Sequence, residues 1–427
     1  MSVRAGILVT GTEVITARIS DRNGPWLSER LAALGVEVAH ILVVGDRAAD
    51  LEAGLRFLAA DGCDLIVTSG GLGPTADDLT AEVVGRFTGR EMVLDEGMEE
   101  KIARIIAGFA RRLRFDPEAV RAANRKQAMV PGGAATIDPA GTAPGLVVPG
   151  EGGPVVIVLP GPPRELQAMW PEALATPEAR SVIDRAEPYR TQTLRMFGIP
   201  ESEIAKALRE IEEQGLELAE LEITTCLRRG ELEIDVRHRP GADRAREALV
   251  EKLAARYERY LYSRDGSTID EQVAALLRER HRIALAESCT AGLLASRISE
   301  PPGASKYLAG GVVAYADDAK HDMLDVPAEL LEAHGAVSPE VAEAMADGAI
   351  GRFRADVGVG ITGIAGPGGG TKSKPVGYVC VCAKLADGPV LARDPVIPGD
   401  RGEIRDRACT LALHFLRRLL RGEELPV

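Results

Sequence analysis

Apolar and polar positions follow two patterns along the chain, and these patterns alternate. Short apolar runs bounded by glycine or polar residues are typical of buried strands, whereas apolar residues spaced three and four apart are typical of helices. In the N-terminal part these patterns predict strands at residues 5–10, 36–44 and 64–69 and helices at residues 26–34 and 49–60. Strands that alternate with helices predict a parallel sheet with helical crossovers. The C-terminal part repeats the alternation, so we predict two three-layer α/β domains.

A different order of elements separates the two α/β domains. A proline-containing, charged boundary at residues 171–188 precedes a strand, a helix, two strands and a helix, which predict a small α+β module. This order resembles a KH-like fold, but the GxxG clamp of nucleic-acid-binding KH domains is absent at residues 198–201. We therefore interpret the module as a spacer or dimerisation module in preference to an RNA-binding one. The predicted domains are residues 1–175, 188–264 and 266–427.

The strongest chemical signal in the C-terminal domain is the stretch 282–298. An apolar run at 283–286 leads through a small polar cluster into a helical pattern, which predicts a strand, a tight turn and a helix. Such a turn places the hydroxyls of Ser288 and Thr290, and the backbone at Gly292, beside unpaired N–H groups at a helix N-terminus. These groups stabilise a phosphate or an oxyanion, and Ser288 can act as a nucleophile. Alternatively, Ser288 or Thr290 only caps the helix.

Partners for this serine follow the neighbouring predicted strands. Tyr315 ends a strand and Lys320 lies in the first turn of the next helix, so both side chains can project into one cleft. A buried lysine can accept the proton of a serine, and such a pair suits hydrolysis of an amide through an acyl-enzyme. Lys320 could equally be an ordinary surface lysine. A loop at Thr362 and Gly363 and the guanidinium groups of Arg401 and Arg405 complete the predicted site, because arginine forks bind phosphate or carboxylate.

A second candidate site lies in the N-terminal domain, in the glycine-rich loop 70–80. Glycines let the backbone approach a ligand closely, and the loop precedes a predicted helix that starts near two aspartates. Carboxylates at the ends of predicted strands could hold a hydrated Mg²⁺ or another divalent metal against a pyrophosphate. Alternatively, the two aspartates only satisfy the first turn of the helix. The candidate residues are Gly70, Gly71, Gly73 and Thr75 for the ligand, and Glu13, Asp46, Asp77 and Asp78 for the metal.

Composition narrows the possible partners. The net charge of -13 and the 4% of aromatic residues disfavour a nucleic-acid or anionic-membrane binder, which needs basic and stacking surfaces. Basic residues such as Arg111, Arg112 and Arg114, in a helical segment predicted at 97–127, are interpreted as a solvated face. The sequence shows no secretion signal or membrane span and its six cysteines are scattered, so we expect a cytoplasmic protein with free thiols.

The motifs together resemble the CinA family of competence/damage-inducible proteins, over nearly the whole chain. In this family a domain similar to molybdopterin-binding proteins precedes a nicotinamide-nucleotide deamidase domain. The motifs are GTE at 11–13, SGGLGPTADDLT at 69–80, LPGPPRE at 159–165, AESCTAG at 286–292, VAYADDAK at 313–320, HGAVS at 334–338, TGIAGPGGG at 362–370, KPVG at 374–377 and GDR at 399–401.

The resemblance implies that the C-terminal domain hydrolyses nicotinamide mononucleotide to nicotinate mononucleotide and ammonia, in pyridine nucleotide salvage and without a cofactor. Ser288 would be the nucleophile, Lys320 and Tyr315 would handle protons, Thr362 would line the site, and the arginines would bind the phosphate or steady the loop. Ala291 stands where the family commonly has glycine, a change that we expect the first helical turn to tolerate. For the N-terminal domain the resemblance implies a metal-dependent ADP-ribose pyrophosphatase.

Two other functional hypotheses remain open at this stage. The N-terminal domain could hold a pterin or nucleotide without turnover, or the protein could be an accessory factor in DNA uptake. The acidic charge and the missing GxxG pattern disfavour the second hypothesis. The middle module, without an evident ligand site, makes a symmetric homodimer plausible.

Overall fold

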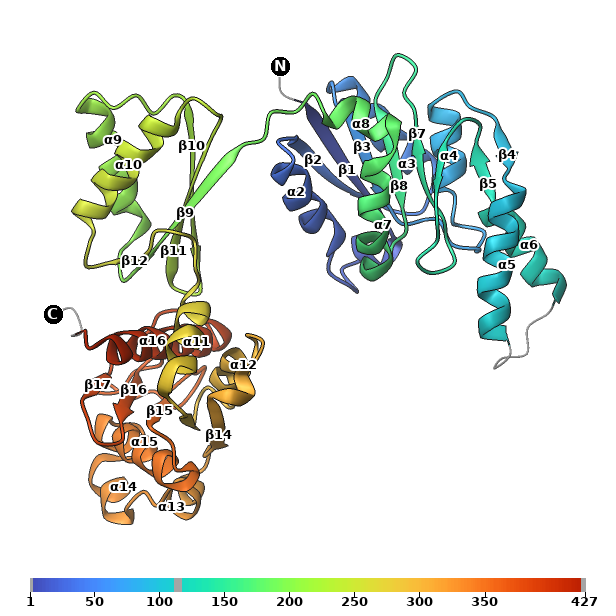
Figure 1. Ribbon diagram of the computed structural model, residues 1–427. Coiled ribbons are helices and arrows are strands. Elements are labelled where there is room, and N and C mark those ends of the chain that lie inside the picture. Colours follow the sequence, from blue (N-terminus) through green and yellow to red (C-terminus); the bar gives the residue numbers. More distant parts are fainter. Residues whose placement is uncertain (1–2, 111–116, 424–427) are drawn as a thin grey trace. The chain divides into compact units, whose positions relative to one another are not determined.

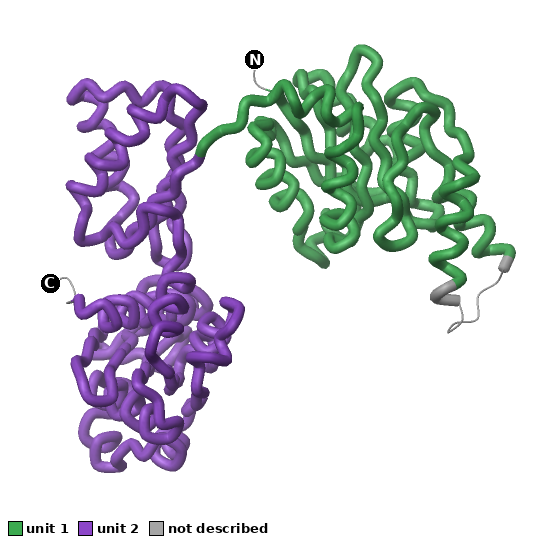
Figure 2. The backbone as a smooth tube through the Cα atoms, viewed as in Figure 1, with its two compact units in different colours: residues 1–190 green, residues 191–427 purple. Residues whose placement is uncertain are grey.

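The protein is described by a computed structural model that covers residues 3–110 and 117–423. Two compact units make up the chain, Met1–Arg190 and Thr191–Val427, shown in green and purple in Figure 2. The N-terminal unit extends beyond the predicted limit at residue 175, and the predicted middle module belongs to the same compact unit as the C-terminal sheet.

The N-terminal unit is built on a six-stranded sheet with the order β2-β1-β3-β8-β7-β6 (Figure 1). The first four of these strands are parallel, as predicted, and β7 and β6 add antiparallel strands at one side. The strands of the unit, including the separate pair β4 and β5, are β1 (Arg4–Thr10), β2 (Glu37–Val44), β3 (Leu65–Ser69), β4 (Met92–Leu94), β5 (Met129–Pro131), β6 (Ala135–Ile137), β7 (Gly145–Val148) and β8 (Val155–Leu159).

Helices cover both faces of this sheet, which gives the predicted three layers. Alternate residues of β1 face opposite sides: Ile7 packs with Leu27 and Leu31 of α2, whereas Leu8 packs with Leu55 of α3. The helices of the unit are α1 (Thr12–Ile15), α2 (Asn23–Ala33), α3 (Ala48–Ala60), α4 (Thr80–Phe87), α5 (Glu96–Ala110), α6 (Pro117–Gln127), α7 (Pro163–Ala175) and α8 (Pro177–Ile183).

One expectation about this unit needs revision, and part of another lies outside the described residues. Within the helical segment predicted at 97–127 the structure describes helices α5 and α6, whereas Arg111, Arg112 and Arg114 lie outside the described residues. The predicted boundary contains helix α8, whose Val182 and Ile183 are buried in the core. The prolines of this stretch do not mark a domain boundary, because Pro177 stands at the start of α8, where its missing N–H is not needed.

The C-terminal part of the second unit has a five-stranded sheet with the order β14-β13-β15-β16-β17. The first three strands are parallel, and β16 and β17 are antiparallel to their neighbours. Helices α11, α12 and α16 cover one face and α13 and α15 the other. Its elements are α11 (Ile269–Arg280), β13 (Ile283–Glu287), α12 (Leu293–Ser299), the 3₁₀ helix η1 (Ala304–Lys306), β14 (Leu308–Val313), α13 (Asp317–Leu324), α14 (Ala328–His334), α15 (Pro339–Phe353), β15 (Val357–Gly363), β16 (Val379–Leu385), β17 (Val390–Arg393) and α16 (Arg401–Arg421).

Strand β15 lies directly against helix α15 in this domain. A Cβ atom added at Gly360 would stand 1.9 Å from the carbonyl oxygen of Ala342 in α15, so only glycine permits this approach. Ser338 caps α15, because its side chain accepts from the N–H of Val341 at 3.2 Å and Pro339 follows at the first helical position. These contacts fix β15, which ends at the candidate active site.

The predicted α+β module is present as a four-stranded sheet with the order β10-β11-β9-β12 and two helices. Strand β12 was not predicted, because three residues carry too little pattern. Likeness to a KH fold stays a prediction. The elements of the module are β9 (Arg190–Phe197), α9 (Glu201–Glu213), β10 (Leu221–Arg228), β11 (Glu231–His238), α10 (Asp243–Arg256) and β12 (Leu261–Ser263).

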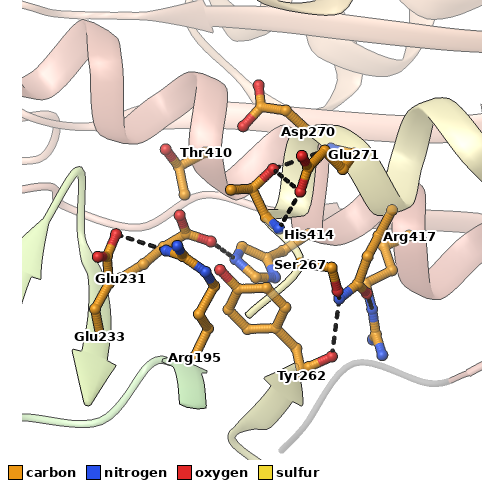
Figure 3. Close-up of polar contacts among 12 residues, drawn as sticks. Arg195, Glu231, Glu233, Tyr262, Ser267, Asp270, Glu271, Thr410, His414 and Arg417 are labelled. Atoms are coloured by element: carbon orange, nitrogen blue, oxygen red, sulfur yellow. Dashed lines mark hydrogen bonds and ion pairs between the residues drawn. The ribbon is translucent and has the colours of Figure 1, made fainter. Parts of the chain in front are cut away.

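A buried polar cluster joins the module to helix α16 (Figure 3). His414 of α16 is 3% exposed, and its Nε2 lies 2.7 Å from a carboxylate oxygen of Glu231 in β11. Phe197 of β9 stacks on the imidazole ring at 3.8 Å between centroids, and Tyr262 meets it edge-on. Burial lowers the pKa of His414, although Glu231 acts in the opposite direction. The imidazole is therefore neutral at pH 7 and donates to the carboxylate.

All six cysteines are free thiols, as expected, and only Cys226 among them is exposed. Within the described ranges, no helix combines the length and the apolar composition that a membrane crossing requires.

Candidate active sites

The predicted nucleophile Ser288 lies in the turn that follows β13. Its N–H donates to the carbonyl oxygen of Ile361 in β15 at 2.9 Å, and the carbonyl oxygen of Glu287 accepts from the N–H of Ala314 beyond β14 at 2.9 Å. These bonds fasten the turn to the strands on both sides. Ser288 is 7% exposed, so it lies in a largely water-excluded position at the carboxyl edge of the parallel strands.

The helix N-terminus beside Ser288 is occupied by a carboxylate of the protein itself. Glu287 is 2% exposed, and its two oxygens accept hydrogen bonds from the backbone N–H groups of Gly292, Leu294 and Ala295 at 3.0, 3.1 and 2.8 Å. The prediction of unpaired N–H groups for a substrate is therefore wrong at these three positions. The sequence predicts no role for Glu287, which directly follows the apolar run 283–286 as the first residue of the polar cluster.

Residues 291 and 292 do not belong to the helix, in contrast to the prediction, which began it at Ala291. Helix α12 starts at Leu293, with neither Ser288 nor Thr290 as its cap, so the capping alternative is also wrong. Ala291 has φ +50° and Gly292 φ +88°, both in the left-handed region. Ala291, which stands where the CinA family commonly has glycine, therefore lies in a strained turn and not in a helical turn. Thr290 is fully buried and its hydroxyl has no partner among the described residues, so contact with substrate would require the turn to move.

Arg405, which lies on helix α16, holds the turn that carries Ser288. Its Nε donates to the carbonyl oxygen of Cys289 at 3.0 Å and one terminal nitrogen donates to that of Thr290 at 2.8 Å. A capping box between Asp400 and Glu403 fixes the start of α16, from which Arg405 projects. Of the two roles implied for Arg405, steadying the loop is the one that its contacts fit.

Lys320 is buried, so the alternative of an ordinary surface lysine is wrong. It is 1% exposed, and its ammonium group donates to the carbonyl oxygens of Tyr315 and Ala316 at 3.3 and 3.5 Å and to the carboxylate of Asp317 at 3.3 Å. The lysine thus lies against the chain segment that leaves β14. No hydrogen bond joins Lys320 to Ser288 in the described structure.

Tyr315 and Arg401 form the exposed rim of the same edge. Tyr315 is 54% exposed, and its hydroxyl accepts a hydrogen bond from Arg401 at 2.7 Å. The other terminal nitrogen of Arg401 donates to the carbonyl oxygen of Gly366 at 2.7 Å. Arg401 therefore links the segment after β14 to the glycine loop after β15, and it places a guanidinium group beside the predicted cleft.

The loop after β15 is positioned by two side chains. Thr362 is 1% exposed and donates to the carbonyl oxygen of Ala336 at 2.7 Å, so its hydroxyl holds the 334–338 segment. Lys374, for which we predicted no role, donates to the carbonyl oxygens of His334 and Val337 at 2.8 and 2.7 Å. Gly363 lies at the end of β15, and a side chain there would collide with Val379 of β16.

The predicted loop of the N-terminal unit lines a cavity of about 330 Å³ at the carboxyl ends of β1, β3 and β8. Gly70 and Gly71 have φ +106° and +66°, and added side chains would collide with Thr10 and Thr80. The walls of the cavity include Gly70, Gly71, Gly73, Glu13, Asp46, Asp77, Asp78 and Glu165. The structure thus brings together all the predicted N-terminal site residues except Thr75.

Threonine side chains hold three of the four carboxylates that the sequence predicts for this site. Asp46 accepts from the hydroxyls of Thr10 and Thr12 at 3.0 and 2.6 Å. Thr75 donates to Asp77 at 2.5 Å and also to Asp78, and its hydrogen bond lowers the pKa of Asp77. Both aspartates precede α4, which begins at Thr80, so the alternative that they belong to the first helical turn is wrong.

Glu165 of α7 is a further carboxylate in this cavity, for which we predicted no role. Burial raises the pKa of Glu165. No hydrogen bond to this carboxylate is present within residues 3–110 and 117–423. The turn at Gly161 and Pro162, within the LPGPPRE motif, also lines the cavity.

The residues of this cavity fit a metal ion only if a bound ligand supplies part of its coordination shell. Within the described residues, no three His, Cys, Asp or Glu side chains gather as a metal-binding set. Mg²⁺ commonly uses one or two carboxylates and completes its shell with water and substrate phosphates. The cavity, with its carboxylates and open glycine backbone, fits an ion that arrives with a phosphate-bearing ligand, and Asp77 and Asp78 are the candidate protein ligands on the glycine-rich loop.

Comparisons with known proteins agree with the two units. Residues 6–180 match the family model described as "Probable molybdopterin binding domain", and residues 266–420 match that of the CinA C-terminal domain. The fold and these matches define an α/β protein that joins a molybdopterin-binding-like domain to a CinA-type C-terminal domain.

Relatives of similar length extend the likeness over the whole chain. A CinA-like protein of Mycobacterium sp. (strain JLS) is 58% identical over 98% of this chain and 99% of its own length. A CinA-like protein of Mycobacterium tuberculosis (strain ATCC 25177 / H37Ra) is 55% identical over 99% of this chain and 98% of its own. A competence/damage inducible protein of Agrobacterium tumefaciens of known structure is 39% identical, with a TM-score of 0.35, and covers 38% of this chain and 99% of its own. The chain belongs to the CinA family.

Proposed function

We propose that the C-terminal domain is an amidohydrolase that converts nicotinamide mononucleotide and water to nicotinate mononucleotide and ammonia, in pyridine nucleotide salvage. The proposal is supported by the position of Ser288, Tyr315, Thr362 and Arg401 at the carboxyl edge of β13, β14 and β15, and by the burial of Lys320 against the segment that leaves β14. A nucleophile, proton-handling groups and a cation at one sheet edge are the parts that amide hydrolysis of an anionic substrate needs.

The reaction follows from these positions. The Ser288 oxygen attacks the carboxamide carbon, and its proton passes to Lys320 in the neutral amine form. The ammonium group that results, together with the Tyr315 hydroxyl, returns a proton to the departing ammonia. Water then cleaves the acyl-enzyme ester, which restores the serine hydroxyl and leaves nicotinate. Arg401 supplies a guanidinium group for the phosphate. Arg405 and Glu287 act indirectly, since they hold the turn that carries Ser288.

We propose for the N-terminal unit a metal-dependent hydrolysis of the pyrophosphate of ADP-ribose. The proposal is supported by the cavity that combines an open glycine loop with the carboxylates of Glu13, Asp46, Asp77 and Asp78. A divalent ion bound there would polarise a phosphoryl oxygen. The second candidate, a binding domain that holds a pterin or nucleotide without turnover, is favoured by the threonine bonds that already engage three of these carboxylates.

Two variants separate the two activities. Ser288→Ala should abolish ammonia release from nicotinamide mononucleotide and leave hydrolysis of ADP-ribose intact, because the sites lie in separate units. Asp78→Asn should have the opposite effect in the presence of Mg²⁺, and Ser296→Ala, an exposed serine on α12, should affect neither. Loss of both activities in Ser288→Ala would contradict the assignment of the sites. Absence of ADP-ribose turnover in the parent protein would favour the binding domain.

We also propose a cytoplasmic homodimer. Light scattering of the purified protein gives its mass directly, and a monomer across the micromolar range would contradict this assembly. A role in DNA uptake stays the alternative for the whole protein. It would be supported by salt-sensitive DNA binding, which the net charge of -13 disfavours.

A further inference from the structure

In addition to the cavity of the N-terminal unit, a cavity lies within the C-terminal unit, between the α+β module and helix α16. Its volume is about 500 Å³, which is within the range of small-ligand sites, roughly 300–1,000 Å³. The end of β9, Tyr260, the end of β17 and one face of α16 form its walls. The cavity is separate from the candidate active site, since none of its lining residues belongs to the turn, loops or side chains described there.

Aromatic side chains are concentrated in these walls. Only 4% of the chain is aromatic, yet Phe197, Tyr260 and Phe415 all line this one cavity, with the His414 imidazole beside them. Phe197 and His414 are stacked nearly parallel, with 13° between their planes. The buried bond from His414 to Glu231, drawn in Figure 3, keeps the imidazole in place. Such walls favour a flat ring, because aromatic groups gain from stacked and edge-on contacts.

The charged groups in the walls carry a positive excess, although the protein as a whole is strongly acidic. These groups are Arg393, Arg418 and Asp394. The carboxylate of Asp394 already accepts a hydrogen bond from the Tyr378 hydroxyl at 2.7 Å. Arg418 donates to the carbonyl oxygen of Arg259 at 3.1 Å, which holds its guanidinium group at the seam with the module. Two guanidinium groups beside an aromatic cavity complement a carboxylate or phosphate.

We propose that this cavity binds a small aromatic anion, meaning a flat heteroaromatic or phenyl ring that carries a carboxylate or phosphate. The ring would lie among Phe197, Tyr260 and Phe415, and the anionic group would face Arg393 and Arg418. The ligand would contact the module and α16 together. A free aromatic carboxylate and a nucleotide share this chemistry, and separate titrations with nicotinate and with AMP distinguish these two sources.

The test uses 4-bromobenzoate as the probe and the full chain. Calorimetric titration should give one site, and the uncharged 4-bromobenzamide should bind at least about tenfold more weakly, because it lacks the charge that arginine recognises. Arg393→Ala and Arg418→Ala should each weaken the acid about tenfold. Arg421→Ala, on the same helix but outside this cavity, and Arg401→Ala, at the active site, should bind it as the parent does.

Crystallography locates the probe independently of the variants. An anomalous bromine peak between Phe197 and Phe415 would support the proposal, and a peak only in another place would overturn it. Equal affinity for the acid and the amide, or no binding of either, would also overturn it. If Arg418→Ala does not fold, Arg418→Lys retains the charge without the planar fork and should still bind more weakly than the parent; unchanged affinity would contradict a guanidinium contact.

Discussion

The carboxylate of Glu287 provides a stringent test of how the catalytic turn is held. The change Glu287→Gln keeps the size of the side chain and replaces one of its two acceptor oxygens by an NH₂ group. In the protein the carboxylate accepts from three backbone N–H groups, those of Gly292, Leu294 and Ala295. An amide oxygen can retain the two bonds made by one oxygen, and the third N–H then faces an NH₂ donor.

The expected cost follows from these bonds. A buried donor left without a partner costs about 1–3 kcal/mol, and two hydrogen bonds to a charged group become bonds to a neutral one. The favourable interaction of a negative charge with the helix N-terminus, about 0.3–1 kcal/mol, is lost as well. We therefore expect the free energy of opening this turn to fall by about 2–4 kcal/mol. This corresponds to amide hydrogen exchange that is roughly 30- to 1,000-fold faster.

Hydrogen exchange followed by mass spectrometry measures this effect on peptides that span residues 288–299. Glu300→Gln, an exposed glutamate at the end of α12, is the matched control and should leave exchange unchanged. Both tryptophans, Trp26 and Trp170, lie in the N-terminal unit. Denaturation followed by tryptophan fluorescence should therefore be the same for both variants and the parent.

Exchange that changes by less than about threefold in Glu287→Gln would refute the reasoning. The carboxylate would then not be what holds the start of α12, and the backbone N–H groups beside Ser288 would be available to a substrate after all. A shift of the tryptophan transition would show that the variant acts on the whole molecule and not on the turn.

Three further predictions concern strain, pH and thiols. Ala291→Gly should raise the stability of the C-terminal unit by up to about 1 kcal/mol in urea denaturation, because glycine tolerates φ +50°; a loss of stability would contradict the strain. Burial lowers the pKa of His414 below 6.5, so the unfolded chain binds a proton that the folded protein does not, and stability should fall as pH drops from about 6.5 toward the folded pKa. The melting temperature between pH 7 and 5.5 should therefore decline less in His414→Gln than in the parent, and equal slopes would argue against a buried neutral imidazole. Finally, Ellman's reagent should modify one thiol rapidly in the native protein and none in Cys226→Ser, because the other five cysteines are buried. Burial also raises the pKa of these thiols, for example that of Cys289 to about 12, which keeps them unreactive. Fast reaction of a second thiol would contradict this burial.

Much of the fold is predictable because its strands and helices are long and strongly patterned. Strand β13 contains the predicted strand 283–286 and one further residue. The alternation of strands and helices correctly predicts that neighbouring strands pair in parallel. The elements that were missed are short or depend on distant partners. Strand β12 has three residues and is defined by its pairing with β9, and α8 begins at a proline that resembles a boundary.

The candidate sites were predictable to the level of which strand ends meet, and not to the level of individual bonds. The rule that ligands bind at the carboxyl ends of parallel strands places Ser288, Tyr315 and Thr362 at one edge. It says nothing of Glu287, because a carboxylate in a strand pattern gives no sign that it turns inward to three N–H groups. The left-handed conformation of Ala291 is likewise imposed by the turn as a whole.

The central claim, a serine amidohydrolase that needs no metal, is tested most directly by ammonia release from nicotinamide mononucleotide in the presence of EDTA. The parent protein and Ser288→Ala are compared at equal concentration, with Ser296→Ala as the control. We expect release by the parent and by Ser296→Ala and none by Ser288→Ala, because only Ser288→Ala lacks the nucleophile. Equal release by Ser288→Ala, or no release by the parent, would contradict it.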